Sequence, residues 1–383
     1  MDVNTQLVRH GDTPRQKSFT VLYPIRSGSA SGETPAVPFS RMTTGSFFAT
    51  MLLVSRPCCG REPSEEEGRN AMLDIRDVFS NLFGLFLLIG VGYGTVRLRV
   101  LPASASKMLS SLLMNVTMPA TIFTSLVRPY DPAFLRAGLL EVVLGLALYI
   151  LYGVISTLLA RPFRVTRERR GLWTFACAFN NNGFMGFPIA LALFGEEGLA
   201  LAVFLGIPFN LLAYTTGATL ICMDRSASGD APPVSWRSIL LTVVNGATLL
   251  GLILYAAQIP IPEVIDTPLT YLADVTTPLS MLIIGMNLTG GSVSALLRNR
   301  DVLSSAFLRL LFLPLLTWWI LMLLPVEDPL VIGVTLIIMA MPSPAVTSIL
   351  AETYGGDTQF ASEAVFLSSL LCLVTIPLIS LLL

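Results

Sequence analysis

Two short polar clusters inside apolar segments carry the residues that could do chemistry in this chain. The first is Asn180-Asn181-Asn182-Gly183, and the second is Met341-Pro342-Ser343-Pro344. Amides and hydroxyls are neutral hydrogen-bond donors, and a proline inside a helix removes a backbone hydrogen bond at a cost of about 3 kcal/mol. Broken backbone in apolar surroundings is tolerated only where protein or a water-filled cavity covers it. The clusters therefore predict two interrupted helices that meet at a polar site.

The ends of interrupted helices would favour a negatively charged ligand. Where a helix restarts after a break, its first N–H groups are free and the positive end of its dipole points at the break. Two such ends at one point form an anion site. The expected donors are Asn180, Asn181, Asn182 and Ser343. The residues expected to shape the crossing are Gly186, Pro188, Pro342 and Pro344. The alternative, that these residues only kink and pack helices, stays open at this stage.

Side chains suited to enzymatic chemistry are scarce. The single histidine, His10, lies far from the apolar segments. The five cysteines show no metal-site or disulfide-framework spacing outside the adjacent pair Cys58-Cys59. We expect no catalytic residue, no metal and no cofactor, because no nucleophile and base pair falls at one depth. A formal net charge of -1 offers no basic surface for nucleic acid.

The apolar segments that hold the clusters are long and numerous. Of the 383 residues, 53% are hydrophobic and 13% charged, whereas soluble domains carry about 25% charged residues. This composition predicts an all-α polytopic protein in a lipid bilayer. Its ten expected helices are 77–96, 106–127, 137–160, 171–194, 198–222, 238–258, 268–290, 302–324, 329–351 and 360–383. At about 1.5 Å per residue, both polar clusters lie near the bilayer centre.

Similar short sequence motifs occur in the same order in the two halves of the expected bundle. Gly186-Phe187-Pro188 and Leu193-Phe194-Gly195 in the first half correspond to Pro342-Ser343-Pro344 and Thr353-Tyr354-Gly355 in the second. Each half has five helices, an odd number, so the second half must be inverted in the membrane. This predicts two inverted five-helix repeats, with the site where broken helices 4 and 9 cross. The expected domains are a first repeat, 72–222, a cytoplasmic linker, 223–237, and a second repeat, 238–383.

Charged residues in the loops predict the orientation. Twelve Lys and Arg residues follow odd-numbered helices and two follow even-numbered ones. Because basic loops stay in the cytoplasm, we expect a multi-pass protein of the plasma membrane with both termini outside. Residues 1–71 are polar and aperiodic, which predicts a disordered tail. Our hypothesis is that the native protein begins at Met72.

Other polar residues and glycines receive weaker interpretations. Asn115 and Asn287 are expected to line the cavity or to bond across helices. Glu141, Asp274 and Arg309 lie within about two turns of an expected membrane boundary, which favours interfacial hydration. The glycines of the first helix predict close helix packing. They are Gly84, Gly90, Gly92 and Gly94.

At the two clusters the sequence resembles the auxin efflux carrier family, which includes bacterial malonate and organic-acid carriers and plant PIN-type auxin exporters. The stretch from Asn181 to Pro188 is similar to the family's first crossover, and Met341 to Ala345 with Leu350 to Asp357 is similar to the second. The resemblance covers residues 72–383. It implies that Asn181 falls on a substrate-site asparagine and Pro188 on the crossover proline.

The resemblance implies the fold of the bile acid and arsenite transporter superfamily. In that fold helices 1, 2, 6 and 7 form a scaffold, and helices 3 to 5 and 8 to 10 form a transport domain. The implied function is a secondary carrier of small organic anions, such as malonate or malate, with an elevator-type movement. Residues 223–237 are too short for the regulated loop of the plant exporters, so hormone transport is not implied.

Two alternatives and several properties stay open. One alternative is a sodium-coupled solute symporter of the same superfamily, in which backbone carbonyls would bind the cation. The other is a membrane sensor with a transporter fold, which would need a signalling domain. The sequence leaves open whether a proton or a sodium ion is coupled to transport and whether the protein is a homodimer.

Overall fold

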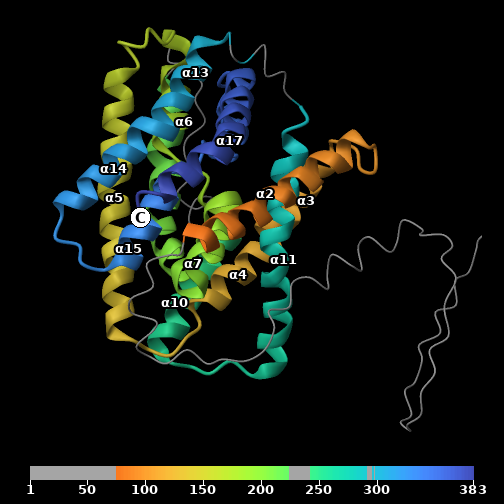
Figure 1. Ribbon diagram of the computed structural model, residues 1–383, viewed down its shortest axis with the longest axis vertical. Helices are drawn as coiled ribbons and strands as arrows, with labels where there is room; N and C mark the ends of the chain where they lie inside the picture. The colour runs from red at the N-terminus through yellow and green to blue at the C-terminus, as the bar shows by residue number, and fades with distance from the viewer. Residues whose placement is uncertain (1–74, 224–241, 291–295, 297) are drawn as a thin grey trace, which may run out of the picture. The chain divides into compact units, whose positions relative to one another are not determined.

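The described part of the chain is helical. The computed structural model describes residues 75–223, 242–290, 296 and 298–383 (Figure 1). The expected tail, 1–71, the hypothesis about Met72 and all of the expected linker except Met223 lie outside these residues. The first helices are α2 (Ile75–Arg97), α3 (Ala105–Leu112), α4 (Met118–Leu126), α5 (Pro132–Leu159), α6 (Arg170–Ala178), α7 (Phe187–Leu212) and α8 (Ala218–Met223). The run α7 comprises two helices, which meet at a kink where Gly195 has φ 67° and ψ -163°. The later helices are α10 (Val243–Ala257), α11 (Glu263–Asn287), α13 (Arg300–Phe307), α14 (Leu313–Leu323), α15 (Pro329–Met339), α16 (Val346–Tyr354) and α17 (Thr358–Ser380).

Several helical runs have the length and composition of membrane spans. In the described residues, seven runs are long and apolar enough to cross a bilayer, and two shorter apolar helices, Val243–Ala257 and Pro329–Met339, accompany them. This confirms the expected all-α polytopic membrane protein. The arrangement as ten helices in two inverted repeats stays a prediction.

Side-chain caps fix where the helices begin. Asp131 accepts a hydrogen bond from the Ala133 N–H at 2.8 Å, directly before α5, and Asp328 accepts one from the Leu330 N–H at 2.9 Å before α15. Pro132 and Pro329 occupy the first helical position, where a missing N–H costs nothing. Asp357 caps α17 in the same way through the Phe360 N–H. These caps place α5 five residues earlier than the expected start at 137.

Three prolines follow short π-helical turns that let the helix continue. The turns are η1 (Leu113–Thr117), η3 (Asn182–Gly186) and η5 (Leu308–Phe312). Each is followed, two residues later, by a proline: Pro119, Pro188 and Pro314. A proline lacks an N–H and crowds the carbonyl four residues earlier. The wider turn moves that carbonyl away, so η3 and α7 run on through Pro188 and the helix break lies upstream of it.

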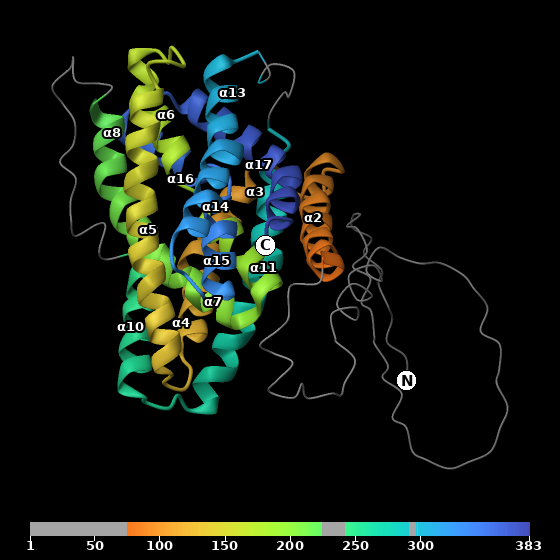
Figure 2. The same cartoon turned by 60° about the vertical axis from the view of Figure 1, so that its left-hand side comes forward.

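The helices pack in two groups that meet along α7. The first group contains α2, α3, α4, α10 and α11, with α2 against α11 and α4 against both α10 and α11. The second group contains α5 to α8 and α13 to α17, with α5 and α15 against α7 and with α13 and α16 against α17. Figure 1 shows α2 crossing α11, and Figures 1 and 2 show α5 running past α6. Contacts between the groups join α7 to α2, α4, α10 and α11, η3 to α11, and α17 to α2.

Close backbone contact joins α2 and α11. A Cβ atom on Gly92 would lie 2.2 Å from the Leu282 carbonyl oxygen, and one on Gly285 would lie 2.0 Å from the Ile89 carbonyl oxygen. Small residues permit this approach. The packing expected for Gly92 is therefore confirmed, whereas it is wrong for Gly84, Gly90 and Gly94, because no described atom outside their own helix backbone lies within 4 Å of their added Cβ positions.

Candidate functional site

The two polar clusters lie at two helix breaks that touch each other. The first helix pair is interrupted between Ala178 and Asn182, and the second between Met339 and Val346. The Asn181 N–H donates to the Pro342 carbonyl oxygen at 2.9 Å, so the interrupted backbones are bonded directly. Segments about 160 residues apart in sequence thus form one crossing point.

Tyr149 of α5 organises two of the three asparagines. Its hydroxyl donates to Asn180 Oδ1 at 2.6 Å, and the Asn182 amide donates to the Tyr149 hydroxyl at 3.1 Å. The Asn180 amide nitrogen donates to the Ile338 carbonyl oxygen. All three side chains are buried. The polar atoms of Asn180 and Asn182 are therefore largely used within the protein.

Asn181 differs from its neighbours because its amide nitrogen is free. Its Oδ1 accepts from the Phe184 N–H at 3.3 Å and caps η3. Among the bonds of the described residues, none uses Asn181 Nδ2, although the side chain is only 5% exposed. Asn181 Nδ2 is not one of the fully buried unpartnered atoms of the described residues, so it faces accessible space and can donate to a ligand.

A small cavity of 60 Å³ lies beside these asparagines. Asn180, Asn181 and Asn182 line it from the first break, and Ala345 and Val346 line it from the start of α16. The N-terminal ends of both resumed helices therefore border one space, and the free N–H groups and dipoles of such ends favour negative charge. The volume equals that of about two water molecules in the liquid.

The other expected crossover residues hold the breaks in shape. Ser343 does not line this cavity; its hydroxyl donates to the Ala176 carbonyl oxygen at 2.8 Å, and its N–H donates to the Ser368 hydroxyl at 3.1 Å. A Cβ on Gly186 would lie 2.9 Å from Ile338 Cδ1, so this glycine permits close approach of α15. Pro342 and Pro344 accept bonds through their carbonyls, from Asn181 N–H and Thr347 N–H respectively. Pro188 is buried in the first turn of α7.

Asn115 and Asn287 lie away from the cavity. Both side chains are exposed, neither lines the crossing, and Asn115 bonds to the Ser111 carbonyl oxygen of its own helix at 2.8 Å. A polar residue near the centre of a segment need not face the bundle interior. Asp274 is exposed, as expected of a hydrated residue.

The expectation of interfacial hydration is wrong for Glu141 and Arg309. Both are 0% exposed. Helix α5 begins at Pro132 and α13 at Arg300, so each residue lies nine positions inside its helical run. Glu141 Oε2 accepts from the Thr335 hydroxyl at 2.8 Å, while Oε1 has no partner in the described part of the chain.

Arg309 binds the ends of the helices that stop at the breaks. Its Nε donates to the Met341 carbonyl oxygen at 2.8 Å and its Nη2 to the Met339 carbonyl oxygen at 2.8 Å. Its Nη1 lies 3.1 Å from the Cys177 oxygen and 3.5 Å from the Ala178 oxygen. Sequence reasoning missed this residue and Tyr149. One sequence feature could have identified Arg309: it is a charged residue within the apolar segment 302–324, and a charged residue in such a segment indicates a functional site.

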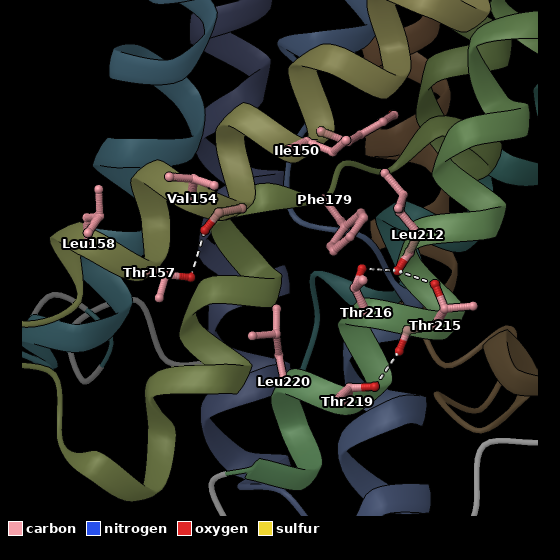
Figure 3. Close-up of a pocket in the computed structure, with 12 residues that line it drawn as sticks. Ile150, Val154, Thr157, Leu158, Phe179, Leu212, Thr215, Thr216, Thr219 and Leu220 are labelled. Atoms are coloured by element: carbon pink, nitrogen blue, oxygen red, sulfur yellow. Dashed lines mark hydrogen bonds between the residues drawn. The ribbon is translucent and has the colours of Figure 1, made fainter.

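A larger, apolar cavity of 720 Å³ is lined in part by Tyr149, and Figure 3 shows the labelled residues of its wall. Its walls include Ile150, Val154 and Leu158 of α5 and Phe179. The hydroxyls of its threonines donate hydrogen bonds to backbone carbonyls of their own helices. Thr157 donates to Gly153, Thr216 to Leu212 and Thr219 to Thr215. This cavity therefore suits hydrocarbon, and its lining lacks the convergent donors of the crossing.

The chain matches the family profile described as "Membrane transport protein" over residues 77–380. This protein belongs to the auxin efflux carrier family of membrane transport proteins. The match covers all the helices that build the crossing, and the resemblance to this family is confirmed. Family membership and the names of relatives indicate a transporter and not an enzyme.

Three relatives of this family member cover most of its length. An uncharacterised transporter of Methanothermobacter thermautotrophicus is 30% identical, over 78% of this chain and 95% of its own. An uncharacterised transporter of Methanocaldococcus jannaschii is 24% identical, over 77% of this chain and 95% of its own. A protein of Rhizobium meliloti named "Putative malonate transporter" is 23% identical, over 80% of this chain and 94% of its own.

Proposed function

We propose that this protein is a secondary carrier of small organic anions and that a substrate carboxylate binds at the crossing. The observation that carries the proposal is the free Asn181 amide beside a cavity bordered by two helix N-terminal ends. Neutral donors and dipole ends stabilise an anion without a cationic side chain in contact with it.

The substrate class is a small dicarboxylate. The name of the Rhizobium meliloti relative supports this choice. The cavity has a volume of 60 Å³, and we propose that the crossing widens or the helix groups separate when a dicarboxylate binds. The roles proposed for Asn180, Asn182 and Ser343 are to hold the crossing and to complete the donor set once it widens.

Transport proceeds by an elevator-type movement of one helix group against the other. The grouping supports this mechanism, because each group has extensive internal packing and the two meet mainly along α7. The breaks at matching places in the two halves support the inverted repeats 72–222 and 238–383. We place the protein in the plasma membrane with both termini outside, on the distribution of loop charges.

A thermal-shift screen of organic acids on the purified protein tests the site. We expect malonate or a related dicarboxylate to raise the Tm of the wild type, because a ligand that binds only the folded state stabilises it. Asn181→Ala should remove most of that shift. Asn115→Ala is the matched control, since Asn115 is exposed and lies off the cavity, and it should keep the full shift.

Two results would refute the proposed site. If no organic acid stabilises the wild type, the substrate class is wrong. If Asn181→Ala keeps the full shift, the acid binds elsewhere. Counterflow in proteoliposomes, with and without a sodium or proton gradient, then separates a uniporter or exchanger from an ion-coupled symporter.

A further inference from the structure

The helices that stop at the crossing point their carbonyl ends at one buried cation. Arg309 donates to Cys177 and Ala178 at the end of α6, and to Met339 and Met341 at the end of α15. The side chain is fully buried, and its Cζ lies 5.5 Å from the centroid of the Tyr152 ring. In the described part of the chain no carboxylate is paired with it, since the ion pairs found there belong to Arg169.

The charge at this point can be estimated from the helix ends. The C-terminal end of a helix carries about half a negative charge, and its last carbonyls have no partner within the helix. Two such ends sum to about one negative charge, which one guanidinium balances. Four convergent carbonyl oxygens are also a donor set that binds monovalent cations in membrane proteins. The Arg309 guanidinium thus lies among carbonyl oxygens whose number and arrangement suit a monovalent cation.

The opposite side of the crossing presents N–H groups instead of carbonyls. The cavity beside Asn181 borders the start of η3 and the start of α16, and Arg309 does not line it. An anion in this cavity would be attracted by the N-terminal ends of η3 and α16 and repelled by the C-terminal ends of α6 and α15. The Arg309 guanidinium neutralises the two C-terminal ends, so the electrostatic potential at the cavity is positive.

We propose that Arg309 is the built-in counter-cation of the crossing: it neutralises the ends of α6 and α15, makes the cavity anion-selective and replaces a bound sodium ion. The claim that Arg309 makes the cavity anion-selective rests on the proposed function. The claim that Arg309 occupies a cation site does not. Arg309 is a positioning residue, because it acts through the helix ends and does not touch the substrate cavity.

Chemical rescue tests the cation site. Arg309→Ala removes the guanidinium and leaves room for a small cation, so its Tm should fall and millimolar guanidinium chloride should restore part of the loss. Urea is the matched control, because it has nearly the same shape and no charge. Sodium should also raise the Tm of Arg309→Ala relative to choline, and it should leave the wild type unchanged. If guanidinium raises the Tm of Arg309→Ala no more than urea does, the proposal is refuted.

Malonate binding provides a second readout that a purely structural role would not produce. We expect Arg309→Ala to weaken the dicarboxylate shift on the order of tenfold in apparent Kd, the effect of two helix ends on a buried charge. Guanidinium should restore the affinity and urea should not. If no acid shifts the wild type, the proposed function fails, while the guanidinium rescue of Tm still decides the cation site.

Two further variants decide the matter if Arg309→Ala does not fold. Arg309→Lys keeps a positive charge, and Arg309→Met fills the space without one. Malonate affinity retained within a few-fold in the lysine variant and lost in the methionine variant supports the proposal. Equal affinity in both variants, whether retained or lost, refutes it.

Discussion

The crossing is held by side chains from helices that are distant in sequence. Tyr149 comes from α5, Arg309 from η5 and Asn180 from the first break, and each satisfies buried polar atoms contributed by another segment. Buried polar groups without partners cost about 1–3 kcal/mol each. The network therefore specifies how the two broken helices cross and leaves one donor, the Asn181 amide, for a ligand.

Removal of the Tyr149 hydroxyl should loosen this network. In Tyr149→Phe, Asn180 Oδ1 loses a donor at 2.6 Å and Asn182 loses an acceptor at 3.1 Å. We expect a loss of about 1–3 kcal/mol of stability, measured as a lower Tm in thermal unfolding. Tyr271→Phe is the control, because Tyr271 is 68% exposed, and it should leave the Tm unchanged. Equal Tm values for the two variants would contradict the assigned role of Tyr149.

The helices and their breaks could be predicted from sequence, because their signals are local. Long apolar runs, and clusters such as Asn180-Asn181-Asn182 within them, mark spans and interruptions without knowledge of any partner. The Asp131-Pro132 start of α5 was missed although it is an ordinary cap, and this misplaced Glu141 at an interface. Tyr149 and Arg309 could not be assigned, because their partners lie 31 to 132 residues away.

The contact between α2 and α11 depends on two glycines. A methyl group on Gly92 would meet the Leu282 carbonyl oxygen at 2.2 Å, so Gly92→Ala must push the helices apart. We expect a loss of about 1–3 kcal/mol, the usual cost of overpacking, seen as a lower Tm. Gly90→Ala is the matched control on the same helix, because no described atom outside the helix backbone lies within 4 Å of its added Cβ position. It should keep or raise the Tm, since alanine favours a helix by about 1 kcal/mol over glycine. A similar drop in both variants would refute close packing at Gly92.

At the scale of the whole molecule, loop contacts support the expected alternation of the chain across the membrane. Arg169, in the loop after α5, pairs at 3.5 Å with Asp301 in the first turn of α13 and at 2.7 Å with Asp357 directly before α17. Tyr130, in the loop before α5, donates its N–H to Gln258 after α10 at 2.9 Å. Loops after odd-numbered expected helices therefore meet one another, and so do two loops after even-numbered ones. Loop charge could predict this grouping, but it could not predict which helices pack together.

The elevator-type movement predicts that a cross-link between the helix groups stops transport. Asn210 of α7 donates to Asn245 Oδ1 of α10 at 2.9 Å, so Asn210→Cys with Asn245→Cys joins the second group to the first. Thr121→Cys with Thr276→Cys is the matched control, because these hydroxyls lie 2.7 Å apart within the first group. Both pairs are made without the other cysteines and assayed by dicarboxylate counterflow in proteoliposomes. Oxidation should abolish counterflow in the first pair, reversibly with reductant, and spare it in the second. If the oxidised first pair transports normally, the groups do not move against each other along α7, because a covalent bond at that border cannot accommodate an elevator displacement.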